Sequence, residues 1–251
     1  MIEKQIEKYW DERSQGYSTS IQEQMNSPKK EVWKSLIKKY AGEGDKIKAM
    51  DVGAGPGFFS ILMGELDYGV TTVDVSEDML KEAKKSMEYA GFQGNFVKGE
   101  AHQIDFPDQS VDLIVSRNVV WTLTKPEETY KEWRRLLKPG GKILVFDSNW
   151  YLHLSDPELQ KQYNYYRRLA IEKGLIDEVT EEQHKRVEEI AKELPLTYRK
   201  RPEWDQEVLT QLGFQEIIIE DNINEWIYDE AKQLLYTSIP QFILCASKNE
   251  K

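Results

Sequence analysis

The residues with the clearest chemical potential are three alternating glycines, Gly53, Gly55 and Gly57, which directly follow an apolar run ending in Asp51. An apolar segment that starts at Phe58 comes next and predicts a helix. A strand, a glycine turn and a helix form the first unit of a nucleotide-binding α/β fold. Glycine allows a tight turn and lets a ligand approach the backbone where a Cβ would collide. The stretch therefore predicts a ligand-binding loop at the carboxyl end of a strand.

The spacing of these glycines fits neither of two common phosphate loops. A dinucleotide fingerprint has its third glycine at position 58, where Phe58 stands, and the Gly-Lys-Ser/Thr of a P-loop does not follow. The remaining pattern, D-x-G-x-G-x-G, resembles the first motif of class I S-adenosylmethionine (SAM)-dependent methyltransferases. The resemblance implies SAM as cofactor and S-adenosylhomocysteine (SAH) as product. A glycine turn without a ligand is the alternative. The loop residues that the resemblance assigns to the cofactor are Asp51, Gly53, Ala54, Gly55 and Gly57.

Asp74 is the second candidate, because it ends the next apolar run, residues 69–75. An acid at the end of the second strand can accept hydrogen bonds from both ribose hydroxyls of a nucleoside. Ser76 then predicts the N-cap of a helix. The resemblance adds Val75 and Met79 to the cofactor contacts, with Met79 against one face of the adenine; a plain core methionine is the alternative.

Two further strand ends extend this site. Glu100-Ala101 follows the third predicted strand, 95–99, where the family usually has Asp-Ala. The resemblance implies an adenine contact from the Glu100 carboxylate or from the Ala101 backbone. Ser116 and Arg117 end the fourth strand, and by resemblance they lie near the methionine carboxylate and amine of SAM.

Asn118 and Trp121 come directly after that strand and are expected to face the reacting methyl group and the substrate. Trp121 is expected either to hold the sulfonium by a cation–π contact or to close the core. The runs F-P-D-x-S at 106–110 and L-L-K-P-G-G at 136–141 also resemble this family, most closely its ubiquinone/menaquinone-biosynthesis type. The resemblance covers residues 45–147 well and the C-terminal strands loosely.

Residues 1–40 predict amphipathic helices with a break at 14–18. The segment resembles the N-terminal W-D-x-x-A-x-x-Y lid of small-molecule methyltransferases, which implies that Tyr9, Arg13 and Tyr17 fold over the methionine end of the cofactor. A helix packed on the sheet edge, with its aromatic residues in the core, is the alternative.

Residues 150–204 change to charged, tyrosine-rich helices, which we interpret as a cap inserted between the fifth strand, 142–147, and the sixth, 215–220. Such a cap is expected to select the substrate, with Trp150, Arg199 and Arg201 as candidate contacts. The basic run 198–202 fits either a substrate anion or a salt-bridged surface loop. Candidate general bases at this edge are His153, Tyr17 and Tyr151, with Asp147 beside them.

Length and composition limit the remaining choices. The 251 residues suit one α/β domain, with a Rossmann-like, doubly wound sheet of seven mostly parallel strands and an antiparallel last strand. The net charge of −10 argues against general nucleic-acid binding. A single cysteine, the charged start of the chain and the lack of an 18-residue apolar run predict a cytoplasmic protein without a membrane span, a disulfide or a metal site. The expected parts are a helical lid (1–40), a cofactor-binding core (41–149), the cap (150–204) and the end of the core sheet (205–251), where residues 236–246 complete a C-terminal hairpin.

The function that these patterns predict is methyl transfer from SAM to a small molecule by in-line displacement. Two alternatives stay open: a tRNA or rRNA methyltransferase, and a non-catalytic SAM-binding regulatory module. The acceptor, its reacting atom and the oligomeric state (monomer or homodimer) are not specified by the sequence.

Overall fold

The computed structural model describes residues 2–42, 47–175 and 180–250. The predicted parts 1–40, 41–149, 150–204 and 205–251 also contain Met1, residues 43–46, residues 176–179 and Lys251, which lie outside the described residues. Among the described residues, no helix combines the length and the apolar character needed to cross a lipid bilayer.

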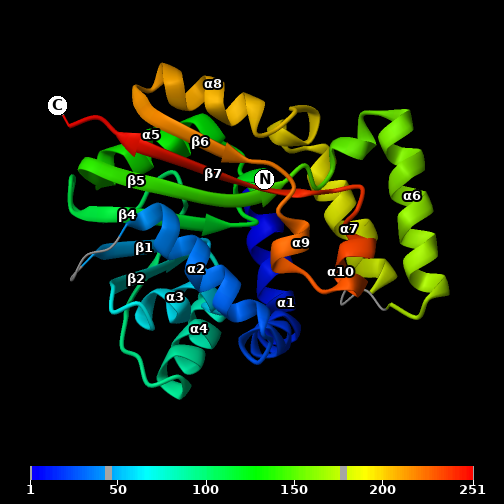
Figure 1. The fold of residues 1–251 in the computed structure, drawn as a ribbon, viewed down its shortest axis with the longest axis horizontal. Helices are drawn as coiled ribbons and strands as arrows, with labels where there is room; N and C mark the ends of the chain where they lie inside the picture. Colours follow the sequence, from blue (N-terminus) through cyan, green and yellow to red (C-terminus); the bar gives the residue numbers. More distant parts are fainter. Residues whose placement is uncertain (1, 43–46, 176–179, 251) are drawn as a thin grey trace.

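A single seven-stranded sheet organises the chain, with the strand order β3-β2-β1-β4-β5-β7-β6 (Figure 1). The strand β7 runs antiparallel to both of its neighbours, and the other pairs are parallel. The predicted fold class is thereby confirmed. The order reverses between β1 and β4, and ligands bind at such a point beyond the carboxyl ends of the strands. The strands are β1 (Lys48–Val52), β2 (Gly69–Asp74), β3 (Asn95–Lys98), β4 (Val111–Arg117), β5 (Leu137–Ser148), β6 (Phe214–Glu220) and β7 (Gln241–Lys248).

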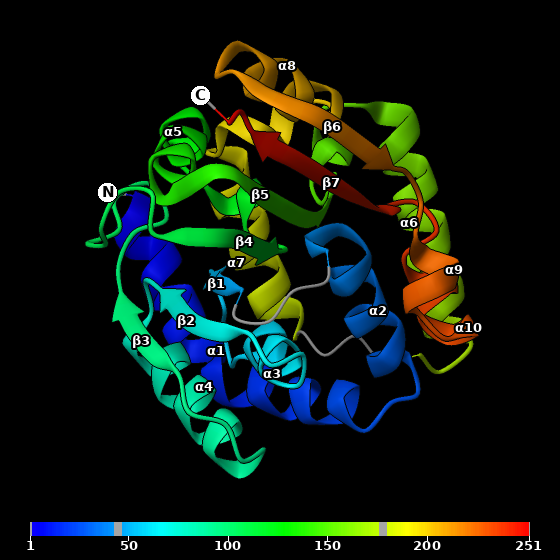
Figure 2. The same ribbon diagram turned by 60° about the vertical axis from the view of Figure 1, so that its left-hand side comes forward.

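Helices cover both faces of the sheet, which explains why its central strands are apolar almost throughout (Figure 2). One face packs against α2 (Lys29–Ala41), α3 (Phe58–Gly64) and α4 (Glu77–Tyr89). The other face packs against α5 (Pro126–Leu136) and α8 (Glu203–Gln211). Ser76 caps α4, as predicted, by accepting a hydrogen bond from the Met79 backbone N–H at 3.0 Å.

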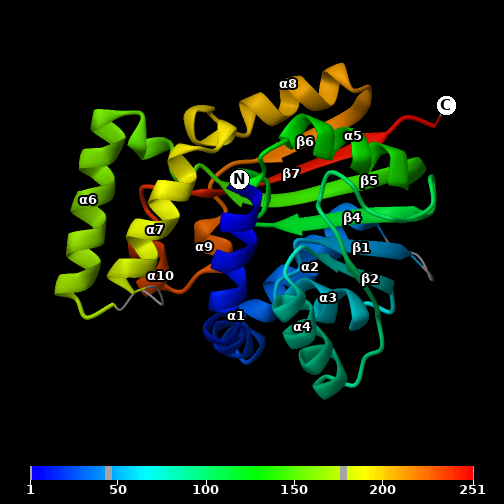
Figure 3. The ribbon, with the colours of Figure 1, turned by 180° about the vertical axis from the view of Figure 1, so that it is seen from behind.

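The first helix, α1 (Ile2–Met25), is continuous and lies across the carboxyl edge of the sheet (Figure 3). The predicted break at 14–18 is therefore wrong. Gly16 costs a helix about 1 kcal/mol relative to alanine, but Ser14 and Ser18 beside it are buried, so tertiary packing maintains the helix. The next helix, α2, buries Trp33 and Ile37 in the same core as the sheet.

Two insertions rise from the carboxyl edge and lie side by side (Figures 1 and 3). The cap contains α6 (Pro157–Glu172) and α7 (Glu181–Lys192), which follow β5. The second insertion, α9 (Asn224–Ile227) and α10 (Glu230–Leu235), separates β6 from β7. The sequence predicted only a simple hairpin at this place, so this insertion is a correction.

Candidate active site

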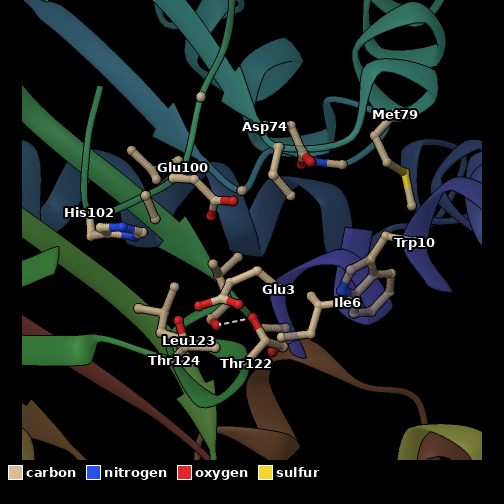
Figure 4. Close-up of a pocket in the computed structure, with 18 of the residues that line it drawn as sticks. Glu3, Ile6, Trp10, Asp74, Met79, Glu100, His102, Thr122, Leu123 and Thr124 are labelled. Carbon is tan, nitrogen blue, oxygen red and sulfur yellow. Dashed lines mark hydrogen bonds between the residues drawn. The ribbon is translucent and has the colours of Figure 1, made fainter. Parts of the chain in front are cut away.

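The crevice at the point of strand-order reversal contains a cavity of about 100 Å³, which we call the smaller cavity (Figure 4). The loop after β1 forms its floor, and Asp74 and Met79 form one wall. Glu100 and Ala101, after β3, also line the cavity. Glu100 lies beside Asp74, and Leu123 lies across the space from both (Figure 4). Most residues predicted to contact a cofactor are thus brought together here.

The glycine loop has the backbone that the sequence requires. Gly53, Gly55 and Gly57 have φ values of 69°, 52° and 89°, in the left-handed region that favours glycine. A Cβ added to Gly53 would lie 2.3 Å from a methyl carbon of Val119. Val119 therefore packs directly against the backbone of Gly53, and only glycine fits at this position of the loop without rearrangement.

The two acids that end β1 and β2 have different roles. The Asp74 carboxylate lines the smaller cavity and accepts hydrogen bonds from the backbone N–H groups of Gly55 (2.8 Å) and Ser76 (2.9 Å). Burial raises its pKa to about 6. Asp51 does not line the cavity, because its carboxylate accepts a hydrogen bond from the Ser60 hydroxyl at 2.7 Å, and burial raises its pKa to about 7. Asp51 thus holds α3 to the sheet.

At the end of β4, the two neighbouring residues predicted as cofactor contacts have different surroundings. Ser116 is fully buried and its hydroxyl donates to the Val52 carbonyl at 3.0 Å, so its side chain has a structural role. Arg117 lies over the Trp33 ring, 4.6 Å from its centroid, and donates to Gln24 of α1 at 2.8 Å. Its guanidinium therefore connects the strand end to α1.

The helix α1 covers one side of the smaller cavity. Trp10 and Tyr17 line the cavity, and the Tyr17 ring lies 3.3 Å from a Cβ built on Gly55. Asp11 fixes this position by accepting a hydrogen bond from Ser76 at 2.5 Å. A volume of 100 Å³ is below the roughly 300–1,000 Å³ of pockets for drug-sized ligands. The side chains of α1 thus narrow the smaller cavity.

A second, larger cavity of about 620 Å³ lies between α1, the cap and the α9–α10 insertion. It shares Trp10, Tyr17, Arg117 and Asn118 with the smaller cavity, so the two spaces meet at these residues. Asn118 has φ of 57°, a strained conformation of the kind that clusters at functional sites. The larger cavity is lined by ten aromatic residues: Tyr9, Trp10, Tyr17, Trp33, Trp121, Trp150, Tyr151, Tyr163, Tyr228 and Tyr236.

Three of the predicted substrate contacts, Asn118, Trp121 and Trp150, line this larger cavity, as does the candidate base Tyr151. The predicted cofactor contacts Tyr9 and Arg13 line it too, and they do not line the smaller one. Sequence reasoning missed the contribution of α9 and α10, because helices of four and six residues are too short to produce a clear periodicity.

The basic cluster of the cap does not reach either cavity. Arg201 is 2% exposed and donates to Asp147 at 2.6 Å and to Asp205 at 2.8 and 2.9 Å. Its prediction as a substrate contact is therefore corrected: it is a buried structural cation, and it is not on a surface loop. Arg199 is exposed and lines neither cavity.

The ion pair of Arg201 with Asp147 holds two residues that line the larger cavity. Asp147 is fully buried, so it is not available as a general base. It accepts hydrogen bonds from the Trp150 indole at 3.0 Å and from the Trp121 backbone N–H at 3.2 Å. Arg201 therefore positions both tryptophans through Asp147.

The predicted base His153 is buried behind the cavity wall. It is 4% exposed, lines neither cavity and stacks on Tyr163 with ring centroids 4.0 Å apart. Burial lowers its pKa to about 4. The prediction of His153 as a general base is therefore wrong, and its ring packs in the interior. Of the other candidates, Tyr17 lines both cavities and Tyr151 lines the larger one.

A hydrogen-bonded pair that sequence reasoning missed lines the larger cavity on the cap side. The Tyr163 hydroxyl lies 2.9 Å from His184 Nε2, and Arg167 donates to the same hydroxyl at 3.1 Å. Tyr163 and His184 belong to different cap helices, so only the Tyr163–Arg167 spacing of four residues was visible in the sequence.

Residues 50–145 match the family model described as a methyltransferase domain. The ubiquinone/menaquinone biosynthesis C-methyltransferase of Roseobacter denitrificans is 31% identical over 139 residues, which cover 54% of each chain. The chain thus spans about half the length of this curated relative.

Solved structures with the same fold have much lower sequence identity. Phosphoethanolamine N-methyltransferase 2 of Haemonchus contortus, in complex with SAM, superposes with a TM-score of 0.59 at 17% identity, over 86% of this chain and 51% of that one. The [4+2]-cyclase SpnF superposes with a TM-score of 0.57 at 16% identity, over 87% of this chain and 80% of that one. At these identities the similarity establishes the fold, and function has to be argued from the site.

Proposed function

We propose that the chain, whose residues 50–145 match the model of a methyltransferase domain, is a class I SAM-dependent methyltransferase that transfers the methyl group of SAM to a small molecule held in the larger cavity. One observation carries the proposal: the crevice with the glycine loop and the aromatic cavity meet at Tyr17, Arg117 and Asn118. When bound, SAM supplies a sulfonium methyl group that a nucleophile can displace in line.

The residues of the smaller cavity fit such a cofactor. Gly53 and Gly55 line the space with no side chains of their own, so a ligand can approach the backbone of the loop. The Asp74 carboxylate has lone pairs beyond the two that its backbone partners use, and these can accept ribose hydroxyls. Met79 and Glu100 lie on opposite sides of the space and would flank an adenine.

The work of the protein in this reaction is alignment and exclusion of water. Holding nucleophile and methyl group in line supplies most of the rate enhancement expected for an already activated group. The helix α1 covers the junction of the cavities, and its Glu12 pairs with Arg186 of α7. Lid and cap are thereby joined over the site.

The size of the larger cavity supports a small acceptor. Its 620 Å³ lies within the range for drug-sized ligands, and its rings offer flat apolar surfaces. A non-catalytic SAM-binding module would be favoured by a pocket too closed for an acceptor, and this cavity is not closed in that way. No observation on the described residues favours an RNA acceptor.

The test is transfer of labelled methyl groups from SAM to a panel of phenols, quinols, amines and total tRNA. We expect label on a small molecule. Ala231→Trp places a large side chain in the larger cavity, so turnover should fall at least tenfold while SAH affinity changes less than twofold. The exposed Thr237→Trp is the control for an added tryptophan on the same insertion. Label on tRNA alone, or none on any acceptor despite SAH binding, would contradict the proposal.

A further inference from the structure

The lining of the larger cavity is more positive than the chain as a whole. The chain has a net charge of −10, yet four basic and only two acidic side chains line this cavity. An excess of positive charge inside an acidic protein indicates a local requirement for an anion. The six charged residues are Arg13, Glu23, Lys29, Arg117, Asp229 and Lys232.

Lys232 interacts within the protein, and two further cations have local partners that explain them. Lys29 donates to the backbone carbonyls of Glu225 (3.1 Å) and Trp226 (2.9 Å). Arg117 donates to Gln24 and lies over aromatic rings. Both side chains therefore connect α1 and α2 with the rest of the fold.

Arg13 has no comparable partner. Its Nη1 donates one long hydrogen bond, 3.4 Å, to the neutral hydroxyl of Tyr9, and its guanidinium lies 5.9 Å from the centre of the Tyr17 ring. No carboxylate of residues 2–42, 47–175 or 180–250 forms an ion pair with it. A guanidinium has five N–H donors in a planar fork that suits a carboxylate or a phosphate. Arg13 is partly buried and lines the larger cavity.

The surroundings of Arg13 also describe the rest of the ligand. Tyr9 and Tyr17 lie one helical turn before and after it on α1, and the neighbouring α7 contributes His184 to the same cavity. Flat rings on several sides favour a planar or apolar body, and an arginine among them favours one negative group.

We propose that the acceptor is an anionic small molecule with a planar body, and that Arg13 binds its carboxylate or phosphate. This inference rests on the proposed function. A second source of the same chemistry is the methionine carboxylate of SAM, for which the sequence resemblance predicted Arg13. Arg13 lines only the larger cavity and not the smaller one, so the geometry favours the acceptor as its ligand.

The experiment is calorimetric titration with three probes: SAH, then 4-hydroxybenzoate and its neutral methyl ester in the presence of saturating SAH. Wild type should bind the benzoate at least tenfold more tightly than the ester. Arg13→Gln should remove this preference while SAH and ester affinities change less than twofold. Arg13→Lys keeps the charge and should restore part of the preference. The control is Lys8→Gln, on the same helix with its side chain 72% exposed.

The outcomes separate the two proposals. If wild type does not bind SAH, the proposed function fails. If SAH binds but neither benzoate nor ester does, or both bind equally, the anionic acceptor is refuted and the cofactor assignment stands. If Arg13→Gln weakens SAH tenfold and spares the benzoate, the arginine serves the methionine carboxylate and the inference is overturned.

Discussion

Replacing Arg201 with methionine is expected to lower the free energy of unfolding by about 3–5 kcal/mol, because removal of one partner leaves a buried charge uncompensated. The guanidinium of Arg201 forms ion pairs with the carboxylates of Asp147 and Asp205, and all three residues are buried. Methionine keeps much of the apolar stem and loses the guanidinium, whose Cζ lies 5.2 Å from the centre of the Phe242 ring, so the loss reports mainly the charge. Since domains are stable by about 5–15 kcal/mol, the variant should still fold.

Urea unfolding at two pH values tests this reasoning. Burial raises the pKa of Asp147 and Arg201 opposes that shift, so without Arg201 the pKa rises further. A carboxyl whose folded pKa lies above its unfolded value loses stability as pH rises through the interval between them. The loss of unfolding free energy in Arg201→Met should therefore be largest near pH 8 and smaller at pH 5.

The matched control is Arg199→Met, two residues away and exposed, which should change the free energy of unfolding by less than about 0.5 kcal/mol. The Arg201 variant should also alter tryptophan emission, because Asp147 holds the Trp150 indole. Equal effects of the two substitutions, or a deficit independent of pH, would refute the buried network.

Three further results are expected. Gly53→Ala should destabilise the fold by about 1–3 kcal/mol more than Gly140→Ala in urea unfolding, since both have a left-handed φ but only Gly53 would clash with a neighbour; equal losses would contradict the close packing of Val119 on the loop. Burial holds the His153 pKa at about 4, below 6.5, so its contribution to stability is complete above pH 6.5 and is lost as pH falls toward 4. His153→Phe should therefore reduce acid destabilisation in that interval, and an unchanged pH dependence would argue against a buried neutral imidazole. SAH affinity should fall as pH is lowered through about 6, the raised pKa of Asp74, because the protonated acid is a poorer acceptor for ribose hydroxyls; a flat profile between pH 5 and 7.5 would exclude that role.

The features that the sequence predicted well are determined by local chemistry. The alternation of Gly53, Gly55 and Gly57 after a strand requires a left-handed loop, and Asp74 at the next strand end must reach the same edge in a parallel sheet. The N-cap at Ser76 is equally local. Each of these depends on a few neighbouring residues.

The features that it did not predict depend on partners far apart in the chain. Arg201 resembles a surface cation until Asp147, from the end of β5, is placed against it. The helix α1 continues through Gly16 because it packs on α4 and α7, which local propensity cannot register. Arg13 of α1, which we propose as the contact for an anionic group, lines the larger cavity, and only the placement of that helix distinguishes it from the basic cluster of the cap.

The most direct test of the account is calorimetric titration of the purified chain with SAM and SAH, beside Asp74→Ala and the control Asp78→Ala, whose side chain is 51% exposed on α4. The account predicts micromolar binding by wild type, a loss of at least tenfold (about 1.4 kcal/mol) in Asp74→Ala and less than twofold in Asp78→Ala. Absence of binding by a wild-type protein that carries no ligand through purification would contradict the assignment of the crevice, and with it the proposed reaction.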